Sequence, residues 1–242
     1  DNQAKKYCRL LIFEIGDALV MKIVIINGSP RKCGSTAYIL HVIEKNLLQK
    51  GASVIFFDLS EQSITLCKGC CSCYKTGHCI INDDAEKISQ ELCNADGVII
   101  GSSTIASNVP GVLKVFIDRG HFVIEQLLHR KYALSVTTYE NYGGKEASGV
   151  LNKLLRLSGA VMCGSVVEKI PFNSDCSSNS KLNSKVKRCI QRLYNDIEQQ
   201  KNYRFQRIKR KLIFGIGLKP FVLHKGDSYA GVKKRWSQIG LL

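Results

Sequence analysis

The sequence has no apolar run long enough to cross a membrane. A membrane-spanning helix needs about eighteen or more uninterrupted apolar residues, and the apolar stretch near the N-terminus, Leu10–Val20, is broken by Glu14 and Asp17. No small-residue cleavage site is evident there, so the stretch does not have the pattern of a secretory signal. We therefore predict a cytoplasmic protein without a membrane span.

Several motifs that define common enzyme classes are also absent. The chain has neither the G-x-G-x-x-G fingerprint of dinucleotide-binding domains nor the G-K-[ST] ending of a P-loop. No nucleophile, His and acid are spaced in a recognisable catalytic arrangement, and no pair of catalytic carboxylates is evident. The chain also lacks internal repeats and low-complexity segments, which excludes repeat architectures.

Length and charge predict one domain with an extension at each end. The 242 residues, 45% of them hydrophobic, suffice for a packed core, and we assign that core to residues 21–200. We expect residues 1–20 to lie outside the functional fold, because Met21 directly precedes the first convincing strand. Residues 201–242 carry 11 Lys and Arg and one acid, a net charge of +10, against +5 for the other 200 residues.

The basic C-terminal extension has two interpretations. Its charge would suit nucleic acid, an anionic membrane surface or an acidic partner. However, apolar and aromatic residues run through it, and it has none of the recognised nucleic-acid motifs, so we favour an extension that packs against the body or a second subunit. We expect truncation after residue 200 to weaken oligomerisation.

Strands and helices alternate along the central part of the chain. The strand segments are apolar throughout instead of alternating, which is typical of a parallel sheet covered by helices on both faces. The expected strands are Lys22–Asn27, Ser53–Leu59, Asp96–Gly101, Tyr132–Thr138 and Val161–Ile170. The expected helices are Ser35–Lys50, Asp83–Asn94, a segment from Pro110 toward His129, Gly144–Ser158 and Asn179–Gln200. The pattern predicts an α/β three-layer sandwich with a five-stranded parallel sheet.

The turn after the first strand has the composition of a phosphate-binding loop. It runs from Gly28 to Thr36, and in sheets of this kind ligands bind beyond the carboxyl ends of the strands. Its glycines allow the backbone to approach an anion, and the following helix offers free N–H groups and its positive dipole end. A Ser- and Gly-rich turn that only caps a helix is the alternative for this segment.

Three loops together resemble the NADPH-dependent FMN reductase family within the flavodoxin-like superfamily. The first is Gly28-Ser29-Pro30-Arg31 with Gly34-Ser35-Thr36. The second is Ser102–Gly120, above all Asn108-Val109-Pro110 and Phe116-Ile117-Asp118-Arg119, and the third is Tyr139–Gly144. The similarity extends over residues 22–200, and the spacing of the loops is kept.

This resemblance implies a flavodoxin-like fold, noncovalently bound FMN and NAD(P)H-dependent electron transfer to an unknown acceptor, from a homodimer or homotetramer. It assigns the FMN phosphate to Ser29, Arg31, Ser35 and Thr36. It assigns the ribityl chain and ring to Ser102, Ser103, Thr104, Ile105 and Asn108, and the third loop and the strand before it contribute Thr138, Tyr142 and Gly143. The family's usual Ser-Pro-x-Tyr in the second loop is here Ser102-Ser103-Thr104-Ile105, so an aromatic residue is missing beside the expected flavin.

Five of the 11 cysteines lie in a loop at 60–82, which is too long for an ordinary connection. The spacing Cys67-x2-Cys70-x2-Cys73-x5-Cys79 resembles the compact motif of iron–sulfur flavoproteins, a branch of the same family that carries its cluster near FMN and the neighbouring subunit. Four soft thiolates suit a 4Fe–4S cluster. A reactive or substrate-gating cysteine loop and a zinc site are the alternatives, and we expect Cys71 to take no part.

Other polar residues receive structural assignments. Asp83 and Asp84 suit the N-cap and first turn of a helix. We expect Asp118 and Arg119 to form an exposed ion pair, and His121 and His129 to lie within a helix without forming a metal-ligand pair.

Two functions from different classes remain open. The first is an FMN-dependent NAD(P)H oxidoreductase that transfers electrons via the flavin, with or without a 4Fe–4S cluster. The second is a flavodoxin-like electron carrier or regulatory FMN-binding protein without intrinsic NAD(P)H oxidation.

Overall fold

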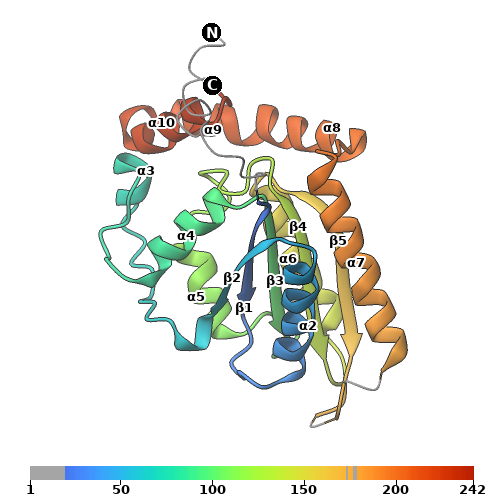
Figure 1. Ribbon diagram of the computed structural model, residues 1–242. Helices are drawn as coiled ribbons and strands as arrows, with labels where there is room; N and C mark the ends of the chain where they lie inside the picture. The colour runs from blue at the N-terminus through green and yellow to red at the C-terminus, as the bar shows by residue number, and fades with distance from the viewer. Residues whose placement is uncertain (1–19, 173, 177–178) are drawn as a thin grey trace.

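A computed structural model describes residues 20–172, 174–176 and 179–242; the N-terminal extension predicted at 1–20 therefore lies almost entirely outside the described residues. Five parallel strands form one sheet in the order β2-β1-β3-β4-β5 (Figure 1). The strands are β1 (Lys22–Asn27), β2 (Ser53–Asp58), β3 (Gly97–Ser103), β4 (Tyr132–Tyr139) and β5 (Val161–Lys169). This order changes direction between β1 and β3, so a ligand crevice is expected at their carboxyl ends. The predicted α/β three-layer fold is confirmed.

Helices cover both faces of the sheet because the strands present apolar side chains on both. One core lies under α2 (Ser35–Gln49) and α7 (Ser180–Glu198), where Ile23 and Ile25 of β1 are buried. The other core lies under α4 (Asp84–Asn94), α5 (Gly111–Arg119) and α6 (Gly144–Leu157), where Val24 and Ile26 of the same strand are buried. Successive residues of one strand therefore point into different cores, as the two-residue period of a strand requires.

The helix that the sequence predicts from Pro110 toward His129 is wrong in its second half. It ends at Arg119, and the chain continues through turns to the start of β4. His121, Gln126 and Arg130 have left-handed backbones, with φ of 56°, 55° and 63°, and such residues do not continue a right-handed helix. Apolar side chains of this segment, such as Phe122 and Leu128, are buried although the backbone is not helical. Their spacing in the sequence therefore resembles the apolar face of a helix.

The C-terminal extension is a row of helices at the amino ends of the strands (Figure 1). It consists of α8 (Arg204–Leu212), the π-helix η2 (Ile213–Leu218), α9 (Lys219–His224), the 3₁₀ turn η3 (Gly226–Tyr229) and α10 (Ala230–Gln238). The fully buried Trp236 anchors the row, and its indole N–H donates to the Ile124 carbonyl at 3.0 Å. The row therefore packs on the body of the same chain.

Two short helices interrupt the long cysteine-rich connection between β2 and α4: the 3₁₀ helix η1 (Leu59–Glu61) and α3 (Ser72–Thr76). Helix α3 lies against α10 and against η3, whose Tyr229 stacks on Tyr74 with ring centroids 4.8 Å apart. Among the described residues, no helix is both long and apolar enough to cross a membrane.

Candidate functional site

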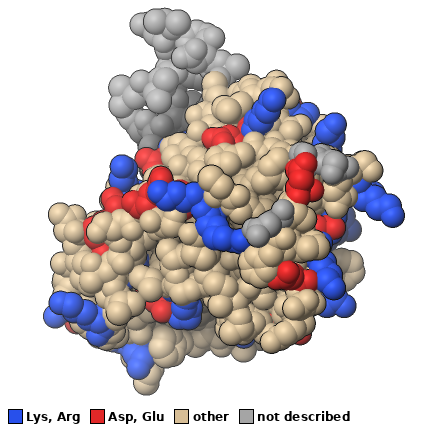
Figure 2. Space-filling model, turned by 90° about the horizontal axis from the view of Figure 1, so that it is seen from below, with Lys and Arg blue, Asp and Glu red and all other residues tan. Residues whose placement is uncertain are grey.

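A pocket of about 390 Å³ opens at the carboxyl ends of β1, β3 and β4. Three loops form its walls: the turn after β1, the loop after β3 and the loop after β4, which are the three loops singled out in the sequence. Figure 2 views the molecule from this end, and its surface is largely uncharged with scattered Lys, Arg and acidic side chains. The residues that line the pocket are Pro30, Arg31, Ser35, Ser103, Thr104, Ile105, Ala106, Ser107, Thr138, Tyr139, Glu140, Asn141, Tyr142, Ile170 and Phe172.

The turn after β1 places the start of α2 at this pocket, where Ser35 is part of the lining. Gly34 caps α2 without a side-chain hydrogen bond, and the first intrahelical bond to it comes from Tyr38, whose N–H donates to the Gly34 carbonyl at 3.0 Å. Among the described residues no side chain caps the amides of the first turn, and with the helix dipole they favour an anion. Arg31 adds a positive charge, and its guanidinium lies 4.7 Å from the ring centre of Phe172.

Gly28 allows the close packing of this turn against its neighbours. A Cβ at this position would lie 2.6 Å from Cδ2 of Leu113 and 2.9 Å from the Gly101 carbonyl oxygen. The Gly28 N–H donates to that same carbonyl at 2.8 Å. The turn is thereby held against β3 and α5, which fixes the position of α2's N-terminus.

A hydrogen bond between two buried threonines connects the first loop to the third. The hydroxyls of Thr36 and Thr138 lie 2.7 Å apart, although 102 positions separate them in sequence. Thr138 lines the pocket, whereas Thr36 lies beneath it. The sequence predicted that both would contact the cofactor, and the structure gives them a mutual contact that joins the loops.

Buried hydroxyls without partners mark the wall formed by the second loop. Ser103 Oγ and Thr104 Oγ1 are buried and have no hydrogen-bond partner within the described chain. Such groups cost free energy unless a ligand or water satisfies them. At the pocket mouth, Ile105, Tyr142 and Phe172 are 51%, 76% and 61% exposed. Polar groups in the wall and apolar groups at the rim fit a ligand that combines a planar ring with a polar chain.

The predicted cofactor residues divide into two groups. Arg31, Ser35, Ser103, Thr104, Ile105, Thr138 and Tyr142 line the pocket, whereas Ser29, Thr36, Ser102, Asn108 and Gly143 lie outside the lining. The second group supports the loops: Ser29 Oγ accepts from the Arg31 N–H at 3.3 Å, and Asn108 pairs with Ile105 through two backbone hydrogen bonds. Sequence analysis missed Phe172, which follows β5 and belongs to no recognisable motif.

The cysteine-rich loop lies on the α4–α5 side of the molecule. Cys67, Cys70 and Cys71 are exposed, and Cys73 and Cys79 are half-buried. Among the described residues, the sulfur of Cys73 forms the one close group of potential metal ligands, together with His121 and Glu125, and the ligand atoms lie within 4.8 Å of one another. The sequence predicted His121 within a helix, and the structure instead places it in the turn after α5, which brings it to Cys73.

His121 is held by acidic groups. Its Nδ1 lies 2.6 Å from Glu125 Oε1, and its Nε2 lies 3.4 Å from Glu86 Oε2. Burial alone would lower the pKa of His121, but its contacts with Cys73, Glu125 and Glu86 raise it to about 12. The Cys73 sulfur and the two carboxylates therefore favour the protonated form of His121.

Arg119 does not form the exposed ion pair with Asp118 that the sequence predicted. Its side chain is buried and pairs with Asp83, while Asp118 pairs with Lys114 one turn earlier on the helix. Arg119 also interacts with the Cys79 side chain, which contributes to the raised pKa of the guanidinium against the opposing effect of burial. Arg119 and His121 therefore each place a positive charge beside a cysteine of the motif.

The pocket and the cysteine group lie at opposite ends of the sheet. Helix α3, which carries Cys73, lies beside α10 at the amino ends of the strands, whereas the pocket opens at their carboxyl ends (Figure 1). A six-residue strand such as β1 spans about 20 Å. Within one chain, the two sites are separated by the length of the sheet.

The comparisons with known proteins agree with this architecture. Residues 21–171 match the family model described as NADPH-dependent FMN reductase. An iron-sulfur flavoprotein of Clostridioides difficile is 38% identical over 92% of this chain and 100% of its own length, and one of Archaeoglobus fulgidus is 32% identical over 75% and 88%. In fold, the chain resembles a flavodoxin of Streptococcus pneumonia TIGR4, with a TM-score of 0.52 and 12% identity over 73% of this chain and 99% of that one.

Proposed function

The chain belongs to the NADPH-dependent FMN reductase family, and we propose that the pocket at the carboxyl ends of β1, β3 and β4 holds FMN. The observation that carries this proposal is the combination of amides without a side-chain cap at the start of α2 with the unpartnered hydroxyls of Ser103 and Thr104. One end of the pocket is suited to a phosphate, and its wall is suited to the polar ribityl chain. Bound FMN would supply two-electron chemistry with NAD(P)H and one- or two-electron chemistry with an acceptor.

The chain's own residues bind and orient the cofactor in this proposal. Arg31 and the Ser35 hydroxyl neutralise and hydrogen-bond the phosphate beside the helix amides. Ile105, which stands where the family's usual aromatic residue is missing, and Tyr142 of the third loop supply surface beside the ring. Because both are more than half exposed, the same face remains open to the nicotinamide of NAD(P)H or to another substrate.

We further propose that Cys67, Cys70, Cys73 and Cys79 hold a 4Fe–4S cluster. The fit rests on the donor set: four thiols within thirteen residues, two of them next to the cations Arg119 and His121. Thiolate sulfur ligates iron, and the positive charges of Arg119 and His121 complement the negative charge that thiolate ligands bring to the site. A bound cluster would supply one-electron transfer.

The separation of the two sites favours an assembly of subunits. Electrons can pass efficiently between flavin and cluster only where the two lie close together, and the sheet keeps them apart within one chain. We propose a homodimer or homotetramer in which the cysteine loop of one subunit approaches the flavin pocket of another. Sedimentation analysis tests this, and a monomer at all concentrations would contradict it.

Anaerobic purification with quantification of flavin, iron and sulfide tests the cofactors. We expect about one flavin and about four iron and four sulfide per chain. Cys70→Ser should abolish the iron and sulfide but keep the flavin, whereas the neighbouring variant Cys71→Ser should keep both. Stoichiometric zinc, or loss of iron in both variants alike, would contradict the cluster proposal.

Steady-state oxidation of NADH and NADPH under anaerobic conditions tests the activity. An oxidoreductase reduces its bound flavin and turns over with an added acceptor. The rival function, an electron carrier or regulatory FMN-binding protein, binds FMN but oxidises neither nucleotide at a significant rate. Bound flavin without nucleotide oxidation would therefore favour the rival.

A further inference from the structure

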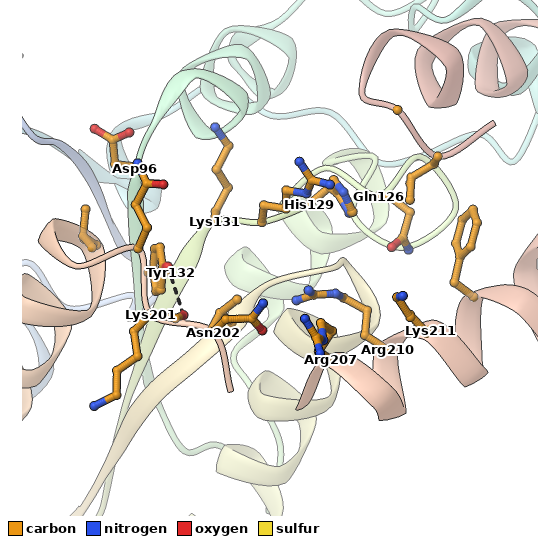
Figure 3. A pocket seen from close by; sticks show the side chains of 17 residues that line it. Asp96, Gln126, His129, Lys131, Tyr132, Lys201, Asn202, Arg207, Arg210 and Lys211 are labelled. Atoms are coloured by element: carbon orange, nitrogen blue, oxygen red, sulfur yellow. Dashed lines mark hydrogen bonds between the residues drawn. The ribbon is translucent and has the colours of Figure 1, made fainter. Parts of the chain in front are cut away.

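A second and larger cavity, of about 690 Å³, lies at the amino ends of β4 and β5, beneath helix α8 of the C-terminal extension. Figure 3 shows Arg207, Arg210 and Lys211 extending from α8 toward His129 and Gln126 in the turns before β4. This cavity is at the opposite end of the sheet from the proposed FMN pocket. The function proposed above does not use it.

The charge of this cavity is almost entirely positive. Six cationic side chains line it: Arg130, Lys131, Lys201, Arg207, Arg210 and Lys211. Asp96 is the one acid in the lining, and its carboxylate already accepts the backbone N–H of Lys22 at 2.9 Å. Within the described residues, Lys201 is the one of these cations with a carboxylate within 4.0 Å, that of Asp196 at 3.8 Å.

Two of these cations, Arg210 and Lys131, are half-buried, whereas the other four are exposed. Burial lowers the pKa of Arg210, and the nearby Arg130 and Arg207 lower it further. Burial likewise lowers the pKa of Lys131. The Arg210 guanidinium donates a hydrogen bond to the backbone carbonyl of Gly159 at 3.4 Å. Charges that are withdrawn from water are normally paired in proteins, and among the described residues neither Arg210 nor Lys131 forms an ion pair with a carboxylate.

His129 provides an independent observation in the same cavity. Both of its ring nitrogens are buried, and neither has a hydrogen-bond partner within the described chain. A neutral imidazole carries one donor and one acceptor, and burying both without a hydrogen-bond partner costs free energy. The left-handed backbones of Gln126 and Arg130 hold the turns on either side of this ring. The cavity therefore contains both unpaired positive charge and an unused hydrogen-bonding side chain.

We propose that this cavity binds a small anion that carries phosphate groups, such as a pyrophosphate or a nucleotide. Guanidinium groups match phosphate oxygens in a two-pronged geometry. Arg207 and Arg210 approach from α8, and His129 lies opposite them in the turns before β4. The volume accommodates more than one phosphate group. Because α8 covers the cavity, an anion bound there would contact both α8 and the body of the protein. It would thereby stabilise the packing of the C-terminal extension on the sheet.

Calorimetric titration of the full chain with inorganic pyrophosphate and, separately, with ADP tests the proposal. Each titration is made with and without one equivalent of FMN, because binding in the flavin pocket disappears once FMN fills it and binding in the α8 cavity does not. We expect saturable binding that persists with FMN and weakens as salt rises. Tighter binding of ADP than of pyrophosphate would indicate a nucleotide, and equal binding would indicate that the anion alone is recognised.

Matched variants on one helix locate the site. Arg210→Gln should weaken pyrophosphate binding about tenfold or more, since a charge-assisted contact is lost. Lys209→Gln removes the same charge from the adjacent exposed position, outside the cavity lining, and should change the affinity less than about twofold. Thermal unfolding without anion checks that both variants fold. Absence of binding to the wild-type chain with FMN present, or equal effects of the two variants, would overturn the proposal.

Discussion

Arg119 and Asp83 form a buried, two-pronged ion pair that joins the end of α5 to the start of α4. Nη1 of Arg119 lies 2.7 Å from one carboxylate oxygen of Asp83, and Nη2 lies 2.9 Å from the other. The guanidinium also donates to the carbonyls of Thr65 and Ile81. One side chain thus closes both ends of the cysteine-rich loop on the body of the protein.

Replacing Arg119 by Met should strongly destabilise the fold. Although burial opposes it, Arg119 together with the N–H groups of Thr65 and Ala85 holds the pKa of Asp83 below its ordinary value. Without the arginine, the Asp83 charge is buried and uncompensated, at a cost of about 3–5 kcal/mol. Urea unfolding measures this cost. Lys114→Met removes the exposed partner of Asp118 and should cost less than about 1 kcal/mol; equal costs would contradict the structural role of the buried pair.

The phosphate loop can be tested with neighbouring cations. Arg31→Gln should raise the dissociation constant of FMN about tenfold, because a charge-assisted contact to the phosphate is lost. Lys32→Gln is the control. Lys32 is exposed, its Nζ lies 2.6 Å from Glu61 Oε1, and it is not part of the pocket lining. Quenching of flavin fluorescence on titration gives both constants. A similar rise in both variants would indicate long-range attraction instead of a specific contact.

Two glycines at the third loop and in the helix after it should respond to alanine in opposite directions. Gly143 has φ +81°, and a Cβ there would lie 2.6 Å from the Cα of Ser107, so Gly143→Ala should cost at least about 1–2 kcal/mol. Gly149 lies within α6 with open space around it, and Gly149→Ala should stabilise the protein by about 0.5–1 kcal/mol. Urea midpoints measure both changes, and destabilisation by Gly149→Ala would contradict this interpretation.

His129 should make the fold less stable in acid. Burial, followed by the charges of Arg130, Arg210 and Lys131, lowers the pKa of His129 from 6.5 to about 4. The unfolded chain therefore binds more protons between these values, so stability falls as the pH decreases from 6.5 toward 4, by up to about 3 kcal/mol. Above pH 6.5 the contribution is constant. As the pH decreases from 6.5 toward 4, the wild type should lose stability relative to His129→Gln. A stability difference between the two proteins that does not depend on pH would refute the prediction.

The C-terminal extension should contribute to stability through Trp236. Its side chain is fully buried, and Trp236→Ala should cost about 3–5 kcal/mol. Trp236→Phe should cost less, because it keeps most of the apolar surface and loses mainly the hydrogen bond to Ile124. Phe205→Ala is the control in the same extension, since Phe205 is 89% exposed, and its effect in chemical unfolding should be close to zero. A large loss of stability in Phe205→Ala would imply that this ring is covered in an assembly.

Local sequence signals predicted most of the fold and the approximate place of the candidate site. Continuous apolar runs such as Lys22–Asn27 predicted buried parallel strands, and β1 has those bounds. The predicted N-cap at Asp83 is also confirmed, since its carboxylate accepts the Ala85 N–H at 3.1 Å. The loops after three strands form one pocket because parallel strands end at the same edge. These features depend on neighbours in sequence or on the direction of the strands, so periodicity and composition are enough to reveal them.

Only the tertiary structure decided the partners of side chains that are far apart in the chain. The exposed pair expected of Arg119 is a buried pair with Asp83, 36 positions earlier. His121 meets Cys73 because left-handed residues end a helix that apolar spacing alone would extend. The cations of α8 gather over His129 because Trp236 fixes the extension to the body. Such contacts arise from packing between distant segments, where burial and charge compensation select partners that no local pattern records.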